Sequence, residues 1–297
     1  MPRRYQTLES LFSALLSEME SEGIYSPKTI AHTREHCQIV ARYLDGRNLY
    51  TLTPQEFRAI HQTMAREGLA VSTQKSYIFT LRKLLHFVNN PTCDTRIVYQ
   101  ADVRPKVDWL SPEEASNVLA ANLPNIQKMA VVLALCMGLR KVEMCRLKMK
   151  DVNLPNRCIT VTGKGRAGGK LRLVPFHALF LPTFECWLKD RAKIVSKSQN
   201  TAEHVLIWFD RHSHTANPYN SVKGSGLDKL IRSAAVTCGV HFSAHTLRRT
   251  FGRMLWLAGV PVVTIAKILG HSSTEQTLQY IGANLDDMAS AMETLTF

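Results

Sequence analysis

Two arginines and one tyrosine in the sequence are suited to chemistry on a phosphodiester. Arg140 follows an apolar run in "VVLALCMGLRKVEM", Arg248 lies in "AHTLRRTF", and Tyr280 ends "LGHSSTEQTLQY". Guanidiniums stay charged throughout the neutral pH range and bind phosphate oxygens through paired, charge-assisted hydrogen bonds. A phenol can attack the phosphorus held between them and become its covalent partner. The combination predicts DNA strand cleavage that keeps the ester energy and needs no metal ion.

Three further side chains have the right types to move protons in such a reaction. Lys164 lies in a Gly-rich basic turn, His245 precedes Arg248 by three residues, and His271 follows the glycine of "LGH". A lysine with a tuned pKa can protonate the departing 5′ oxygen, and histidines can take or hold the phenol proton. Each residue alone is weak evidence, so the hypothesis rests on their order along the chain.

Glu143, three residues after Arg140, lies on the same helical face and can pair with that guanidinium or orient it. From these residues alone, a surface ion pair at a helix start is the simpler explanation. The basic turn is equally compatible with a plain solvated loop. Its "GKG" is not followed by the rest of a Walker pattern, which argues against a nucleotide-binding P-loop.

Three short helices are predicted to position His245, His271 and Tyr280. Apolar spacing predicts a helix that starts near His245 and ends at Gly259, and a second from Pro261 to Gly270. His271 is therefore held directly after a helix end. A third helix starts at the capping signal of two serines and carries the tyrosine about two turns along.

Upstream of these helices, residues 157–176 alternate with period two on both sides of the basic turn, which predicts a β-hairpin with Lys164, Arg166 and Lys170 near its tip. "RHSHTANP" (211–218) is predicted to be a loop. An almost wholly apolar helix is expected over about 125–137. Another helix is expected to start at Ser111, with Pro112 in its first position.

The N-terminal part of the chain predicts a separate helical domain. Apolar residues recur at helical spacing over 8–22, 27–45, 54–67 and 71–89, and 89–110 indicates an extended linker. The 297 residues carry a formal net charge of +13, which suits a polyanionic partner. The seven cysteines contain no CxxC pair and indicate reduced thiols. No apolar run is long enough to span a membrane and the N-terminus has no secretory apolar core, so a cytoplasmic protein is expected, located at the nucleoid if its partner is DNA.

Taken together, these motifs resemble the tyrosine recombinase family, also called phage integrases and including the Xer recombinases. The resemblance rests on "GLRKVEM", the "TGKG" hairpin, "HTLRRTF", "LGHSS" and the tyrosine nine residues after that histidine. It implies a mainly α fold with a small β-sheet and a C-shaped DNA clamp. The implied domains are a helical core-binding domain (1–95), a linker (96–108) and an α+β catalytic domain with a C-terminal tail helix (109–297).

The resemblance also implies a role for each site residue. Arg140 and Arg248 would be the paired arginines with Glu143 as their acidic supporter. Lys164 would be the general acid, and His245 the base. His271 would be the second phosphate donor and Tyr280 the nucleophile. Arg166 and Lys170, with Lys75, Arg82 and Lys83 of the helical domain, are expected to contact DNA.

The implied function is site-specific recombination through a 3′-phosphotyrosine intermediate, as the integrase of a mobile element or virus. Alternatives are an Xer-type chromosome or plasmid dimer resolvase, a type IB topoisomerase-like enzyme, and a DNA-binding module that has lost the chemistry. No cofactor and no metal site are expected. The expected partners are double-stranded DNA with inverted half-sites and three further copies of the chain on synapsed DNA, with a monomer or dimer when free and no membrane. The tail, 281–297, is expected to form an amphipathic helix that docks on its own domain or on a neighbouring protomer.

Overall fold

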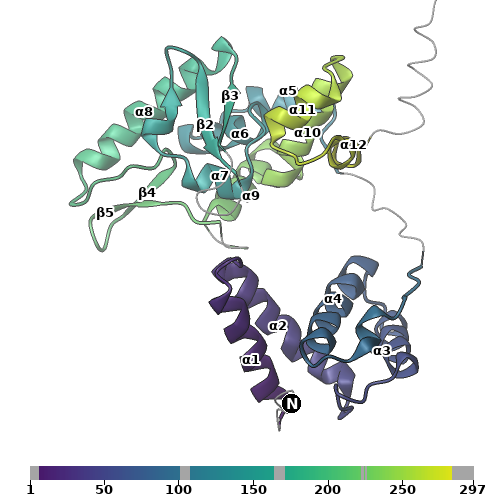
Figure 1. The fold of residues 1–297 in the computed structure, drawn as a ribbon. Helices are drawn as coiled ribbons and strands as arrows, with labels where there is room; N and C mark the ends of the chain where they lie inside the picture. The colour runs from purple at the N-terminus through teal and green to yellow at the C-terminus, as the bar shows by residue number, and fades with distance from the viewer. Residues whose placement is uncertain (1–6, 101–107, 164–170, 222–223, 225, 283–297) are drawn as a thin grey trace, which may run out of the picture. The chain divides into compact units, whose positions relative to one another are not determined.

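The computed structural model describes residues 7–100, 108–163, 171–221, 224 and 226–282. The chain divides into two compact units, Met1–Arg104 and Pro105–Phe297, and each has its own hydrophobic core. Helices dominate both units, and the second also carries two small sheets (Figure 1). The prediction of a mainly α fold with a small sheet is confirmed.

The described part of the first unit folds as four α-helices followed by one 3₁₀ turn. Thr7, Ser26 and Thr53 begin the first three helices by accepting a backbone N–H of the first turn. The four predicted helices are confirmed to within two residues at each end. The elements are α1 (Leu8–Ser21), α2 (Pro27–Leu44), α3 (Pro54–Arg66), α4 (Val71–Phe87) and η1 (Pro91–Asp94).

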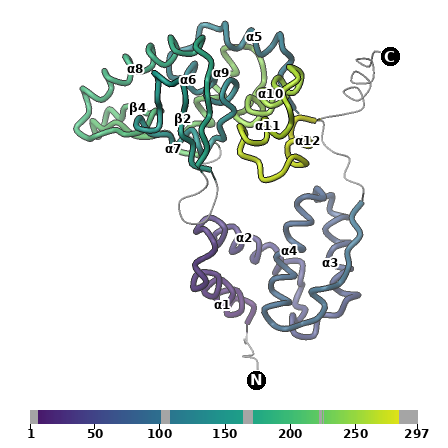
Figure 2. Tube along the Cα trace, turned by 45° about the horizontal axis from the view of Figure 1, so that its top comes forward, coloured from purple at the N-terminus to yellow at the C-terminus, as the bar shows by residue number. Residues whose placement is uncertain are grey.

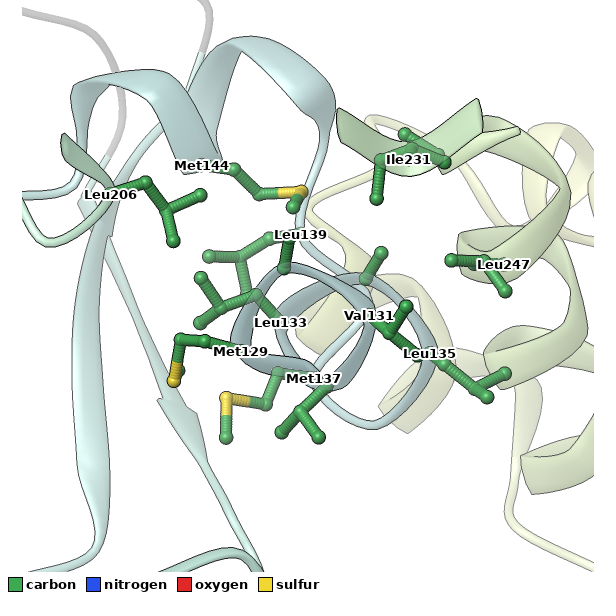
Figure 3. Close-up of a cluster of buried hydrophobic side chains, with 14 of the residues drawn as sticks. Met129, Val131, Leu133, Leu135, Met137, Leu139, Met144, Leu206, Ile231 and Leu247 are labelled. Atoms are coloured by element: carbon green, nitrogen blue, oxygen red, sulfur yellow. The ribbon is translucent and has the colours of Figure 1, made fainter. Parts of the chain in front are cut away.

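The second unit is built around one buried helix, α6 (Asn125–Leu135). Every residue from Met129 to Leu135 is buried, as expected for a helix that is apolar on all faces. Figure 3 shows these side chains pointing outward from the helix toward neighbours that include Met144, Leu206, Ile231 and Leu247. The helices around it are α5 (Pro112–Ala120), α7 (Lys141–Arg146), α8 (Leu181–Ser196), α9 (Leu227–Cys238) and α10 (Ala244–Leu257), with 3₁₀ turns η2 (Met149–Asp151) and η3 (Ala178–Phe180).

Two antiparallel sheets complete the second unit. The predicted hairpin is present as β2 (Cys158–Thr162) and β3 (Leu171–Pro175), and β1 (Val152–Asn153) pairs with β2. A second hairpin pairs β4 (Ile207–Asp210) with β5 (Thr215–Pro218). The prediction of a loop over 211–218 is therefore wrong for its second half. The Asp210 carboxylate accepts hydrogen bonds from the His212 backbone N–H and the Ser213 hydroxyl, which closes the turn between these strands.

The last three described helices are α10, α11 (Val262–Leu269) and α12 (Thr274–Ile281). Figure 2 shows them gathered at one end of the second unit. Gly270 ends α11 with φ of +65°, and Ser273 caps α12 by accepting the Gln276 N–H. The predicted order of helix ends around His271 is confirmed. No helix among the described residues is long and apolar enough to cross a membrane.

Candidate active site

Arg140 and Glu143 form a closed pair at the start of α7. The Arg140 backbone N–H donates to Glu143 Oε2 at 2.7 Å, and its Nη1 donates to Oε1 at 2.9 Å. The Glu143 residue is only 5% exposed, so this is not the surface ion pair that was the simpler explanation from sequence. Burial raises the pKa of Glu143, but the hydrogen bonds and charge of Arg172, with help from Arg140 and Arg248, hold it below its ordinary value.

Arg248 is the most deeply buried arginine described, with 1% of its residue surface exposed. Its guanidinium donates to the carbonyl oxygens of Gly138 and Leu269, and lies 3.6 Å from Glu143 Oε2. Burial lowers its pKa to about 10, so it stays charged at neutral pH. Gly138 has φ of +61°, and an added Cβ there would lie 2.4 Å from Phe251 Cδ1. Only glycine fits this turn between α6 and the arginine pair.

Arg172, on β3, is a member of the site that the sequence analysis missed. Its Nη1 and Nη2 each donate to a Glu143 carboxylate oxygen at 2.8 Å, and its Nε donates to the Ile268 carbonyl at 2.8 Å. This is a bidentate, nearly buried ion pair. A signal did exist in the sequence, because Arg172 shares the inward face of its strand with the buried Val174.

The C-terminal end of α11 holds all three guanidiniums. Its successive carbonyl oxygens at Ile268, Leu269 and Gly270 accept from Arg172, Arg248 and Arg140 respectively. These groups have no partner within a helix and carry its partial negative charge, so cations are favoured there. A Cβ on Gly270 would lie 3.0 Å from Arg172 Nη1, so the helix end and this arginine are packed too closely for a larger residue without a shift.

Tyr280 lies between the two histidines on the inner side of α12. Its ring centroid is 4.9 Å from that of His271 and 5.3 Å from that of His245, both edge-on. The Arg248 guanidinium carbon lies 5.8 Å from the ring centroid and that of Arg249 lies 5.6 Å away. The phenol oxygen is buried and makes no hydrogen bond of ordinary geometry with the described residues. Burial raises its pKa, and the nearby arginines oppose the rise.

Both histidines are held neutral by their surroundings. Burial, followed by the charges of Arg248, Arg140 and Arg172, lowers the pKa of His271 to about 4. His245 keeps much of its surface exposed, but partial burial of the ring and then the neighbouring arginine charges lower its pKa as well. A neutral imidazole carries a lone pair on one of its two nitrogens and can accept a proton there.

The predicted DNA-contacting residues are only partly within the described chain. Arg166 and Lys170 lie outside the described residues, as does Lys164, the predicted general acid. On α4, Lys75 is exposed and its ammonium lies 5.3 Å from the Tyr99 ring centroid. Arg82 donates to the Thr95 carbonyl at 2.6 Å and stacks on Phe57, and Lys83 lies over Tyr25 and Phe79. The side chains of Arg82 and Lys83 thus make contacts within their own unit.

Comparison with known proteins places this chain in a family. Residues 109–286, well over half of the chain, match the phage integrase family model. The chain belongs to this family. The resemblance to the tyrosine recombinases is thereby confirmed, and the chain is an enzyme of that type.

Full-length relatives agree with this result. The recombinase is 25% identical to the tyrosine recombinase XerC of Oceanobacillus iheyensis over 96% of this chain and 95% of that protein. It is 26% identical to XerA of Thermococcus kodakarensis, over 90% and 89% of the two chains. Among solved structures, the Tn1549 transposon integrase in complex with transposon right end DNA has a TM-score of 0.72 at 19% identity, covering 98% of this chain and 99% of that one.

Arg172→Gln is expected to slow strand cleavage by the recombinase about tenfold or more, since a hydrogen bond to a charged group is worth about 1.5 to 3 kcal/mol. Without Arg172, Glu143 is free to draw Arg140 and Arg248 toward itself. Single-turnover cleavage and gel-shift affinity, measured on the same DNA, separate this effect from weaker binding.

The matched control is Arg191→Gln on α8. Arg191 is also partly buried and also donates to carbonyl oxygens, those of His204 and Ala202, but has no contact with Glu143. Equal losses in the two variants would mean that Arg172 contributes only stability. In the background of Glu143→Gln, the Arg172 change should have much less effect, because the group through which it acts is gone.

Proposed function

We propose that this recombinase cleaves DNA by attack of Tyr280 on a phosphodiester bound by Arg140 and Arg248. The bond from the phenol oxygen to phosphorus forms, the bond from phosphorus to the 5′ oxygen breaks, and the enzyme retains the 3′ phosphate. The phenol proton passes to a histidine, and Lys164 protonates the departing 5′ oxygen. Attack by a 5′ hydroxyl on the phosphotyrosine reverses these steps and joins the strands.

The observation that carries this proposal is the convergence on one buried phenol of residues that are far apart in sequence. Tyr280 is next to Arg248, His245 and His271, and its hydroxyl makes no hydrogen bond of ordinary geometry with the described residues. Because these guanidiniums are already held in place, they can stabilise the charge that develops on the phosphate oxygens without having to reorganise. Among the described residues, no group of His, Cys, Asp and Glu is arranged to hold a metal ion.

The proposed partner is duplex DNA with inverted half-sites, bound by both units, with Met1–Arg104 as the core-binding domain. We further propose that four copies assemble on two synapsed sites and that the free protein is a monomer or dimer. One solved structure similar in fold is a lambda integrase tetramer bound to a Holliday junction, with a TM-score of 0.64 at 19% identity over 92% of this chain and 77% of that one. The tail helix, expected to dock on its own domain or on a neighbouring protomer, lies outside the described residues.

The proposed biological role is integration of a mobile element or virus. Chromosome or plasmid dimer resolution is the second candidate, favoured by the Xer names of the full-length relatives. A type IB topoisomerase-like activity is the third. The three roles differ in where on DNA the enzyme acts.

Covalent trapping on genomic DNA tests the reaction and the role together. The protein is incubated with sheared DNA from its source cell in EDTA and without ATP, then denatured, and the strands attached to it are sequenced. We expect adducts at one short sequence with inverted half-sites. Absence of adducts, or a strict need for metal, would contradict the mechanism.

The trapped sequences also decide the role. Adducts at the ends of a mobile element support an integrase, and adducts at one chromosomal or plasmid locus support a dimer resolvase. Dispersed adducts without half-sites support the topoisomerase-like alternative. Sedimentation of the protein on DNA with one and with two half-sites then measures the assembly.

A further inference from the structure

Thr277 is a buried polar residue of α12 that the reaction proposed above does not use. It has no exposed surface and lies one helical turn before Tyr280. Its Oγ1 is 2.9 Å from His271 Nδ1 and 3.2 Å from the Ser273 carbonyl oxygen. On the opposite side of the same imidazole, Nε2 is 3.3 Å from Arg248 Nη2. Both nitrogens of the His271 ring therefore have a partner within the protein.

The partners determine where the ring carries its proton. A guanidinium only donates hydrogen bonds, so the contact with Arg248 favours an Nε2 that accepts and a neutral ring with its proton on Nδ1. The Thr277 oxygen then accepts from Nδ1–H, and the single hydroxyl proton goes to the Ser273 carbonyl. With the proton on Nε2 instead, two N–H groups would face each other at Arg248. An imidazolium would add repulsion between two cations.

We propose that Thr277 is a positioning residue that holds His271 in the Nδ1-protonated form, with the Nε2 lone pair facing the active site. The inference deepens the proposed function and rests on it for its catalytic consequence. His271 then enters the reaction as an acceptor, in contrast to the phosphate donor that the family resemblance implies. If Nε2 takes the phenol proton, the Nδ1–H stays bound to Thr277, and the new Nε2–H can donate to a phosphate oxygen afterwards.

The charged surroundings agree with this arrangement. The charged groups that act on His271 are Arg248 from α10, Arg140 from the residue before α7, Glu143 from α7 and Arg172 from β3. Three positive charges therefore oppose one negative charge. Burial of the ring, and then this balance of charges, disfavour a second proton on the ring before substrate binds. Thr277, as the acceptor for Nδ1–H, thus acts together with Arg248 to fix which of the two neutral forms is present.

The direct test is the protonation site of His271 in the full-length protein, read from ¹⁵N NMR of histidine-labelled enzyme. The His271 signals are identified by their loss in His271→Gln. We expect the proton on Nδ1 in the wild type and in Thr277→Ser, which keeps the hydroxyl. In Thr277→Val, which keeps the shape but not the hydroxyl, we expect a mixture of the two forms.

Single-turnover cleavage supplies the second measurement. Thr277→Val should be slowed about tenfold, the rate equivalent of one lost hydrogen bond, and Thr277→Ser should be within about threefold of the wild type. Thr33→Val is the matched control, because Thr33 is also buried and donates to the carbonyl four residues earlier, in the other unit. It should leave both the His271 signals and the cleavage rate unchanged.

The outcomes separate this inference from the proposed function. A wild-type ring protonated on Nε2 overturns the inference, whether or not the Val variant folds. So does Thr277→Val with an unchanged ring and unchanged cleavage. If the wild type forms no adduct with DNA, the proposed function fails, and the NMR result still decides the role of Thr277 in fixing the ring.

Discussion

Tyr280→Phe is expected to bind DNA as tightly as the wild type and to form no covalent adduct with it. The change removes one oxygen and no charge. Because that oxygen is buried without a hydrogen-bond partner of ordinary geometry among the described residues, its loss leaves no protein group unpaired. The ring contacts with His245 and His271 are kept, so the melting temperature should not fall.

The measurement uses labelled, nicked DNA that carries the site mapped by trapping, with adducts separated on a denaturing gel. Tyr219→Phe is a suitable control, since Tyr219 is a partly buried tyrosine of the same unit with no ring contact to the two histidines. It should form adducts at the wild-type rate. An adduct in the Tyr280→Phe protein would show that another residue is the nucleophile.

Loss of either clamp arginine should slow cleavage at least a hundredfold. The expected cost is about 3 kcal/mol in the transition state, by analogy with removal of a preorganised oxyanion donor. Arg140→Ala is the cleaner variant, because the Arg140 side chain is 28% exposed and its removal leaves few buried groups unpaired. DNA affinity should change little, since many other phosphate contacts hold the complex.

Arg248→Ala should lose cleavage to the same extent but also stability. Its guanidinium is buried and donates hydrogen bonds to the Gly138 and Leu269 carbonyl oxygens, which would lose that donor. Arg146→Ala, at the exposed end of the same helix that Arg140 begins, is the control for both. Wild-type cleavage by Arg140→Ala or by folded Arg248→Ala would show that the clamp is misassigned.

Features with local causes were predictable from the sequence. Ser111 and Ser273 cap helices through backbone groups three residues away, and Gly270 ends a helix through its own backbone angle. The hairpin of β2 and β3 followed from its alternating pattern. These signals lie within one or two turns of the residues that they position, so one sequence is enough to detect them.

The parts of the site that the sequence did not predict depend on contacts between distant segments. Arg172 binds Glu143, 29 residues earlier, and the Ile268 carbonyl, 96 residues later. Within its own strand it is only an inward-facing arginine. The Gly138 carbonyl that Arg248 binds is 110 residues away. Burial of Glu143 follows from this convergence. Because one sequence does not show contacts between distant segments, it favoured a surface ion pair at that position.

The sharing of one carboxylate by three guanidiniums sets the net charge of the site. Among the described side chains, Arg140, Arg172 and Arg248 together with Glu143 carry a formal charge of +2. A bound phosphodiester brings a single negative charge. Bond formation with the phenol oxygen, once its proton has left, brings a second. The charge of the three arginines and Glu143 is thus matched only when the pentacoordinate phosphorus forms, and the histidine that has taken the phenol proton adds one more positive charge beside it. Interactions that strengthen on the way to the transition state are those that accelerate a reaction.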